Sequence, residues 1–205
     1  MKRINYKFQD LTIDLIDCQK ENKPLVLYFY FDELDKFIEK TNKLKKFNLI
    51  AVPVAKIEND LFTRLDHLKI SELIEDATRK LEFKVSNKIV MGYSMSGLIS
   101  VYLCYNSFLF DALISCSSSF WFNNFIDYAL NNQIKSKLKI AYFSIGKKEN
   151  FGKTIFSNSI ELTKKMVDIF NQNNINTYFE LNEGNHFNQI NLRLYKGLSY
   201  CLSFL

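Results

Sequence analysis

Long apolar runs are missing from this sequence of 205 residues. The longest unbroken run, residues 25–31, is seven residues long, whereas a membrane-spanning helix needs about 20. Glycine and proline are also scarce, at six and two residues. That composition excludes collagen-like and low-complexity chains. We therefore expect no membrane span and a single folded domain over residues 1–205.

The few cysteines lack the spacing of a disulfide framework or a metal site. They lie far apart, with no C-x-x-C pair, at Cys18, Cys104, Cys116 and Cys201. Cys104 and Cys116 fall in apolar segments, which favours buried free thiols. The first residues alternate between apolar and polar, without the continuous apolar stretch of a signal peptide. We expect a cytoplasmic protein with no metal and no organic cofactor.

A concentrated basic stripe is absent too, although the formal net charge is +5. The lysines form small groups separated by acidic residues. Nucleic-acid-binding proteins more often gather such charge on one face or carry a known module. We therefore expect no nucleic-acid partner. The sequence does not define an oligomeric state.

Apolar segments alternate between the patterns of strands and of helices. Strands are expected over 25–31, 48–54, 88–91, 111–116, 138–145 and 176–181, after a possible hairpin within 1–18. Helices are expected over 32–46, 70–83, 94–105, 122–131, 155–171 and 189–202, with Ser71 as an N-cap and residues 56–66 as a loop. Such alternation predicts an α/β fold, with a mostly parallel central sheet and helices on both faces. Ligands of such sheets bind at the carboxyl ends of the strands.

One strand-to-helix junction has the pattern of a nucleophile elbow, Gly92-Tyr93-Ser94-Met95-Ser96-Gly97. This sharp turn needs small residues around its serine, because the helix returns close to the strand. Ser94 is the predicted nucleophile. Ser96 replaces the usual second glycine, and we expect it to pack within the first helical turn.

A serine nucleophile needs a base, and the chain has only two histidines. His186 follows the strand ending at 181, so it lies in a carboxyl-end loop, whereas His67 lies in an irregular stretch before a helix. The order serine, acid, histidine is expected in this fold. Glu149, after the strand ending at 145, is the predicted acid. Glu183 is the alternative, and a Ser–His dyad without an acid stays open.

The oxyanion of an acyl-transfer intermediate needs two preorganised donors. One is expected to be the backbone N–H of Met95, directly after the nucleophile. The other is expected from the loop after 25–31, near Tyr30 or Phe31. Residues 146–154 resemble a phosphate-binding loop, but five residues rather than four separate their glycines. The spacing therefore argues against nucleotide binding.

Several segments together resemble the esterase family of the α/β-hydrolase superfamily that contains esterase D-like and siderophore esterases. The similar segments are 92–98, 109–111, 116–122, 142–149, 183–187 and 193–197. The resemblance implies an α/β-hydrolase fold with an eight-stranded core and serine carboxylesterase chemistry at Ser94, Glu149 and His186. It also implies that Trp121 lies near the site, as a wall of the substrate pocket. Only residues 55–69 fill a segment that is usually longer in this family, so a compact form with reduced insertions is expected.

The sequence thus predicts a hydrolase that cleaves a small-molecule carboxylic ester through an acyl-enzyme on Ser94. A thioesterase or an acyl-carrier ester hydrolase would use the same residues. A catalytically inactive binding protein on the same scaffold is the alternative from another class. Retention of Ser94, Glu149 and His186 together argues against it.

Overall fold

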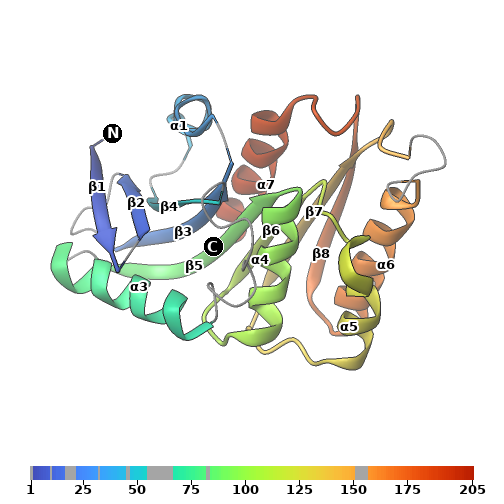
Figure 1. The fold of residues 1–205 in the computed structure, drawn as a ribbon, viewed down its shortest axis with the longest axis horizontal. Coiled ribbons are helices and arrows are strands. Elements are labelled where there is room, and N and C mark those ends of the chain that lie inside the picture. The colour runs from blue at the N-terminus through green and yellow to red at the C-terminus, as the bar shows by residue number, and fades with distance from the viewer. Residues whose placement is uncertain are drawn as a thin grey trace.

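A single eight-stranded sheet crosses the molecule (Figure 1). The computed structural model describes residues 2–9, 11–16, 22–31, 33–44, 47–54, 67–81, 84–150 and 157–205. The strands are β1 (Arg3–Phe8), β2 (Leu11–Ile16), β3 (Lys23–Tyr30), β4 (Asn48–Pro53), β5 (Val85–Tyr93), β6 (Ala112–Cys116), β7 (Ile140–Gly146) and β8 (Asn176–Asn182). Their order in the sheet is β1-β2-β4-β3-β5-β6-β7-β8.

The sheet is parallel from β4 to β8 and antiparallel only at its N-terminal edge. The hairpin expected within residues 1–18 is present, since β1 pairs with β2 with Phe8 opposite Leu11. β2 then pairs antiparallel with β4. The remaining neighbours all pair in parallel, which requires a crossover between strands. The predicted α/β architecture is therefore confirmed.

Helices cover both faces of this sheet (Figure 1). They are α1 (Leu34–Thr41), α3 (His67–Leu81), α4 (Met95–Asn106), the 3₁₀ turn η1 (Phe122–Asn124), α5 (Phe125–Asn131), α6 (Ser159–Gln172) and α7 (Ile190–Phe204). The apolar side chains divide into two buried clusters. One cluster joins the sheet to α3, α4, α5 and α6, and the other joins it to α1 and α7. The central strands are buried on both faces, as their continuous apolar runs predict.

Several helix predictions differ from the structure in their details. Helix α3 begins at His67, so Ser71 is not its N-cap; its hydroxyl instead donates to Glu75 Oε1 at 3.2 Å. The helix expected over 122–131 is divided, because Asn123 and Asn124 have φ values of 49° and 52°. A left-handed conformation there breaks the helical path, and asparagine tolerates it better than most residues. Helix α1 ends at Thr41, short of the predicted 46.

Two further predictions fall wholly or partly on residues that the structure does not describe. The predicted loop 56–66 lies outside the described residues, as do positions 155–156 of the helix expected over 155–171. Positions 157–158 of that prediction form a turn, and α6 begins at Ser159. Cys104, Cys116 and Cys201 are buried free thiols. Of the helices that the structure describes, none is both long and apolar enough to cross a membrane.

Candidate active site

Ser94 lies in a strained turn between β5 and α4. Its φ and ψ are 58° and −123°, in a region that residues with a side chain rarely adopt. Both backbone polar groups of Ser94 are held. Its N–H donates to the carbonyl of Cys116 at 3.0 Å, and its carbonyl accepts from the N–H groups of Leu98 and Ser119, each at 3.2 Å. The strained conformation thus rests on the end of β6 as well as on α4, as a nucleophile elbow requires.

The sterics around this turn explain its small residues. A Cβ on Gly92 would lie 2.2 Å from the carbonyl oxygen of Ser96, and one on Gly97 would lie 2.0 Å from Ser118 Oγ. Ser96 is fully buried, and its hydroxyl donates to the carbonyl of Tyr93 at 2.8 Å while accepting from the Tyr93 N–H at 2.9 Å. The expected packing role of Ser96 is confirmed, and the hydroxyl closes the turn where a glycine is usual.

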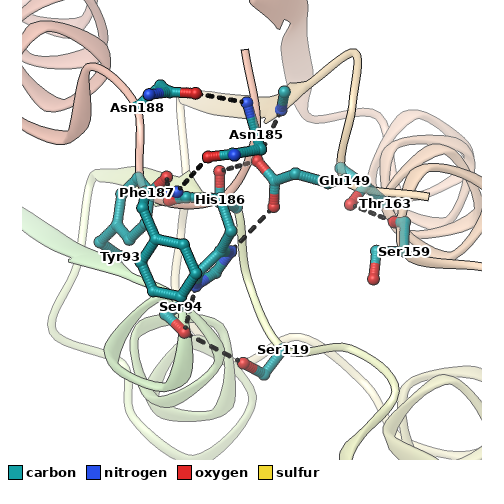
Figure 2. Close-up of polar contacts among 12 residues, drawn as sticks. Tyr93, Ser94, Ser119, Glu149, Ser159, Thr163, Asn185, His186, Phe187 and Asn188 are labelled. Atoms are coloured by element: carbon teal, nitrogen blue, oxygen red, sulfur yellow. Dashed lines mark hydrogen bonds and ion pairs between the residues drawn. The ribbon is translucent and has the colours of Figure 1, made fainter. Parts of the chain in front are cut away.

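Ser94, His186 and Glu149 form one hydrogen-bonded chain (Figure 2). His186 Nε2 lies 3.0 Å from Ser94 Oγ, and His186 Nδ1 lies 2.9 Å from Glu149 Oε2. The three residues follow β5, β8 and β7, so the carboxyl ends of three strands converge here. The imidazole is part-exposed while the carboxylate is buried. This is the order in which a nucleophile, a base and an orienting acid act.

The loop that carries His186 is stiffened by its own side chains. Asn185 Oδ1 accepts from the Phe187 N–H at 3.0 Å, and Asn188 Oδ1 accepts from the Asn185 N–H at 2.9 Å. Gly184 supplies a φ of 88° where the chain leaves β8. From outside the loop, the hydroxyl of Tyr93 donates to the carbonyl of His186 at 2.6 Å. His186 is therefore fixed at its backbone as well as at its ring.

Glu149 is buried, and both of its oxygens are used. Oε2 faces His186, while Oε1 accepts from the Gly146 N–H, from Ser117 Oγ and from Arg193 Nη1, each at 2.7 Å. Burial pushes the pKa of this carboxyl upward, and it is the largest single influence. Hydrogen bonds from His186, Ser117 and the Gly146 N–H together outweigh it, and the pKa of Glu149 lies below its ordinary value. The acid is therefore held ionised.

The alternative acid lies elsewhere. Glu183 forms an ion pair with Lys147 at the surface and is well exposed. Glu149, and not Glu183, contacts the imidazole in this structure, so the geometry favours the first choice over the alternative. His67 begins α3, and its side chain lies outside the described residues.

A pocket opens beside Ser94. Its described lining combines aromatic side chains, serine hydroxyls and the two other members of the hydrogen-bonded chain. These residues are Ser94, Ser117, Ser118, Ser119, Trp121, Glu149, Ser159, His186 and Phe187. Phe187 is largely exposed, and its ring stands edge-on to the imidazole, 5.3 Å between centroids (Figure 2). Ser119 Oγ lies 3.4 Å from Ser94 Oγ. The structure thus places Trp121 on the pocket wall, as the resemblance implies.

The two expected oxyanion donors lie at the same end of the sheet. Met95 follows Ser94 as the first residue of α4, and Tyr30 is the last residue of β3. The side chain of Tyr30 is engaged elsewhere, with its hydroxyl donating to Asp14 Oδ2 at 3.0 Å. Any oxyanion contact of Tyr30 would therefore come from its backbone. Both assignments stay predictions.

Sequence reasoning missed Arg193, which contacts the acid from α7. A signal was present, because 193 falls in the helical phase of the buried positions 194, 197, 198 and 201. An arginine on an apolar face needs a buried partner. Within the described part of the chain, no group of three or more His, Cys, Asp or Glu side chains could hold a metal ion.

The eight-stranded sheet, the strained serine and the order Ser94, Glu149, His186 define an α/β-hydrolase fold. No protein-family model matches the sequence, and no curated protein matches it. Solved structures do match the fold. The siderophore hydrolase EstB from Aspergillus nidulans is 15% identical with a TM-score of 0.71, covering 97% of this chain and 93% of its own.

Two further structures have nearly the same TM-score but are covered over a smaller share of their own length. An IroE-like serine hydrolase from Shewanella oneidensis is 14% identical with a TM-score of 0.72, covering 98% of this chain and 79% of its own. The enterobactin esterase FES from Shigella flexneri is 13% identical with a TM-score of 0.72, covering 98% of this chain and 59% of its own. The resemblance inferred from the sequence is therefore confirmed at the level of the fold.

Proposed function

We propose that this protein hydrolyses a carboxylic ester of a small molecule through an acyl-enzyme on Ser94. The observation that carries the proposal is the hydrogen-bonded chain from Ser94 Oγ through both nitrogens of His186 to Glu149. The strained backbone of Ser94 supports it, because such strain collects at functional sites. The fold neighbours described as esterases and serine hydrolases are consistent with it.

In the first half-reaction, Ser94 Oγ attacks the ester carbonyl carbon while His186 Nε2 accepts its proton. Glu149 keeps the opposite nitrogen protonated and stabilises the imidazolium that forms. Backbone N–H groups near Met95 and Tyr30 stabilise the oxyanion. The C–O bond to the alcohol then breaks, and His186 returns the proton to the leaving alkoxide.

Water completes the second half-reaction. His186 removes a proton from the water, which attacks the acyl carbon, and the same proton returns to Ser94 Oγ as the carboxylic acid leaves. Every proton is conserved, and no step needs a metal or an organic cofactor. The aromatic lining at Trp121 and Phe187 suits an apolar part of the ester.

The test is hydrolysis of a panel of p-nitrophenyl esters and matched thioesters by wild type and Ser94→Ala. We expect wild type to hydrolyse esters and Ser94→Ala to lose at least about 10³-fold in kcat/KM. Rapid quenching should give a mass increase equal to the acyl group on wild type only. Equal rates for the two proteins would refute the assignment of Ser94. Hydrolysis of thioesters but not of esters would show that the same mechanism acts on thioesters, the alternative substrate class.

A further inference from the structure

The buried guanidinium of Arg193 contacts three of the segments that support the candidate triad. Arg193 is 0% exposed, although it lies on a helix at the molecular surface. Nη1 forms an ion pair with Glu149 Oε1 at 2.7 Å and donates to Tyr93 Oη at 3.0 Å. Nη2 donates to the carbonyls of Glu183 at 3.2 Å and Asn185 at 2.9 Å. One side chain thus connects the acid, the residue before the nucleophile and the loop that carries the base.

We propose that Arg193 is a positioning residue of the catalytic triad, which holds Glu149 against His186 and offsets part of the carboxylate's charge. This inference rests on the proposed function. The planar fork of the guanidinium is essential for holding Glu149 in place, because it donates to Glu149 and to the loop that carries His186 in one fixed geometry. Displacing a catalytic group by about 1 Å can cost about 10²-fold in rate.

The second role follows from charge. A full carboxylate charge beside the imidazole favours the imidazolium, which cannot act as a base. Arg193 shares that carboxylate at the oxygen opposite His186, so the imidazole meets less negative potential. Removing the arginine should therefore return the full carboxylate potential to the imidazole and move the acidic limb of the pH–rate profile to higher pH.

The other ionisable groups near this pair do not replace that charge. Within the described residues they are Tyr93 on β5, Cys116 on β6, Lys148 and the Lys147–Glu183 ion pair. Burial raises the pKa of Tyr93, and it raises the pKa of Cys116 to about 12, so both stay neutral near pH 7. The Lys147–Glu183 pair is neutral as a unit and exposed. Arg193 is therefore the buried cation that contacts Glu149 in the described structure.

A glycine in the neighbouring turn makes this arrangement sterically possible. A Cβ on Gly146 would lie 2.7 Å from Arg193 Nη2 and 2.8 Å from Glu149 Oε1. The turn after β7 thus leaves room for both the guanidinium and the carboxylate. The lack of a side chain at Gly146 is therefore part of what accommodates the ion pair between Arg193 and Glu149.

The experiment compares wild type with Arg193→Met and Arg193→Lys, using kcat/KM for p-nitrophenyl acetate from pH 5 to 9. For Arg193→Met we expect a 10- to 100-fold fall in kcat with little change in KM, and an acidic limb moved about one pH unit higher. Arg193→Lys keeps the charge but loses the fork, so kcat should fall while the limb stays in place. Lys196→Met is the matched control, because Lys196 is a cation of the same helix that pairs with Glu180 of β8 rather than with Glu149. It should change neither kcat nor the limb.

A double-variant cycle separates positioning from a purely structural role. In a Glu149→Gln background the charge that Arg193 opposes is gone, so Arg193→Met or Arg193→Lys should cost less than about threefold further. Arg193→Lys keeps the cycle measurable if Arg193→Met does not fold. For Arg193→Met, equal losses in both backgrounds together with an unmoved limb would overturn the inference while the proposed function stands. If Arg193→Met does not fold, equal losses for Arg193→Lys in both backgrounds would overturn it in the same way. A wild type that neither hydrolyses esters nor forms an adduct at Ser94 would refute the proposed function itself, and the inference with it.

Discussion

The hydroxyl of Tyr93 donates a 2.6 Å hydrogen bond to the backbone carbonyl of His186, across 93 positions of the chain. The residue before the candidate nucleophile thus holds the backbone of the candidate base. Their rings also lie against each other, 5.4 Å between centroids. The geometry of the Ser94–His186 pair is therefore set by the end of β5 as well as by the loop after β8.

Tyr93→Phe tests this link, because it removes the hydroxyl and keeps the ring. We expect a loss of about 1 kcal/mol in unfolding free energy from the missing hydrogen bond. The kcat for an activated ester should fall about tenfold, since the base gains freedom to move. Urea unfolding and steady-state kinetics measure the two effects. Unchanged kcat would show that the loop holds His186 without Tyr93.

Glu149→Gln tests the acid. The three donors at Oε1 would keep the amide oxygen at that position, so the amide NH2 group would face His186 Nδ1 and donate to it. The ring then takes the tautomer with its proton on Nε2, which cannot remove a proton from Ser94. We expect kcat to fall by about 10³ to 10⁴. Glu183→Gln is the matched control from the loop of His186, and it should stay within about twofold of wild type, because Glu183 pairs only with Lys147 in the described contacts. Equal effects of the two changes would contradict the assignment.

Glu149 should also make stability depend on pH. Its pKa is lowered in the folded protein, so its contribution is full above the ordinary value of 4.5 and is lost as pH falls through the lower folded value. The ionised carboxylate is lost in Glu149→Gln at every pH. The difference in unfolding free energy between wild type and Glu149→Gln should therefore shrink when urea unfolding is measured below pH 4.5 rather than at pH 7. A difference that grows at low pH would contradict the lowered pKa.

Trp121→Ala tests the pocket wall. Losing an aromatic contact of this size should raise KM about tenfold for esters with bulky acyl groups. Acetate esters, which do not reach the wall, should change little. Trp121→Phe keeps an aromatic surface and should restore most of the loss. A uniform effect on all acyl lengths would indicate that Trp121 supports the fold instead.

The sequence was sufficient for the parts of the site that depend on local pattern. Glycine spacing indicates the turn at Ser94, and the strand-end rule indicates the loops of Glu149 and His186. The position of Ser71 inside a helix could not be predicted in this way, because serine is favoured at helix N-caps over helix interiors, whereas α3 already includes the four residues before it. Neither could the division at Asn123, where two left-handed residues interrupt an otherwise helical pattern.

Contacts between distant segments required the structure. Ser117, directly after β6, and Arg193 of α7 contact Glu149 across 32 and 44 positions of the chain. A single sequence contains no record of such distances. The helical phase of Arg193 indicates burial, but it does not indicate the partner.

The most direct test of the central claim is the intact mass of the protein after incubation with a fluorophosphonate, for wild type, Ser94→Ala and Ser96→Ala. An activated Ser94 predicts one adduct on wild type and on Ser96→Ala, and none on Ser94→Ala. Ser96→Ala is the matched control because its hydroxyl lies two residues away and is fully buried. Folded wild type without an adduct, or an adduct that persists on Ser94→Ala, would contradict the account.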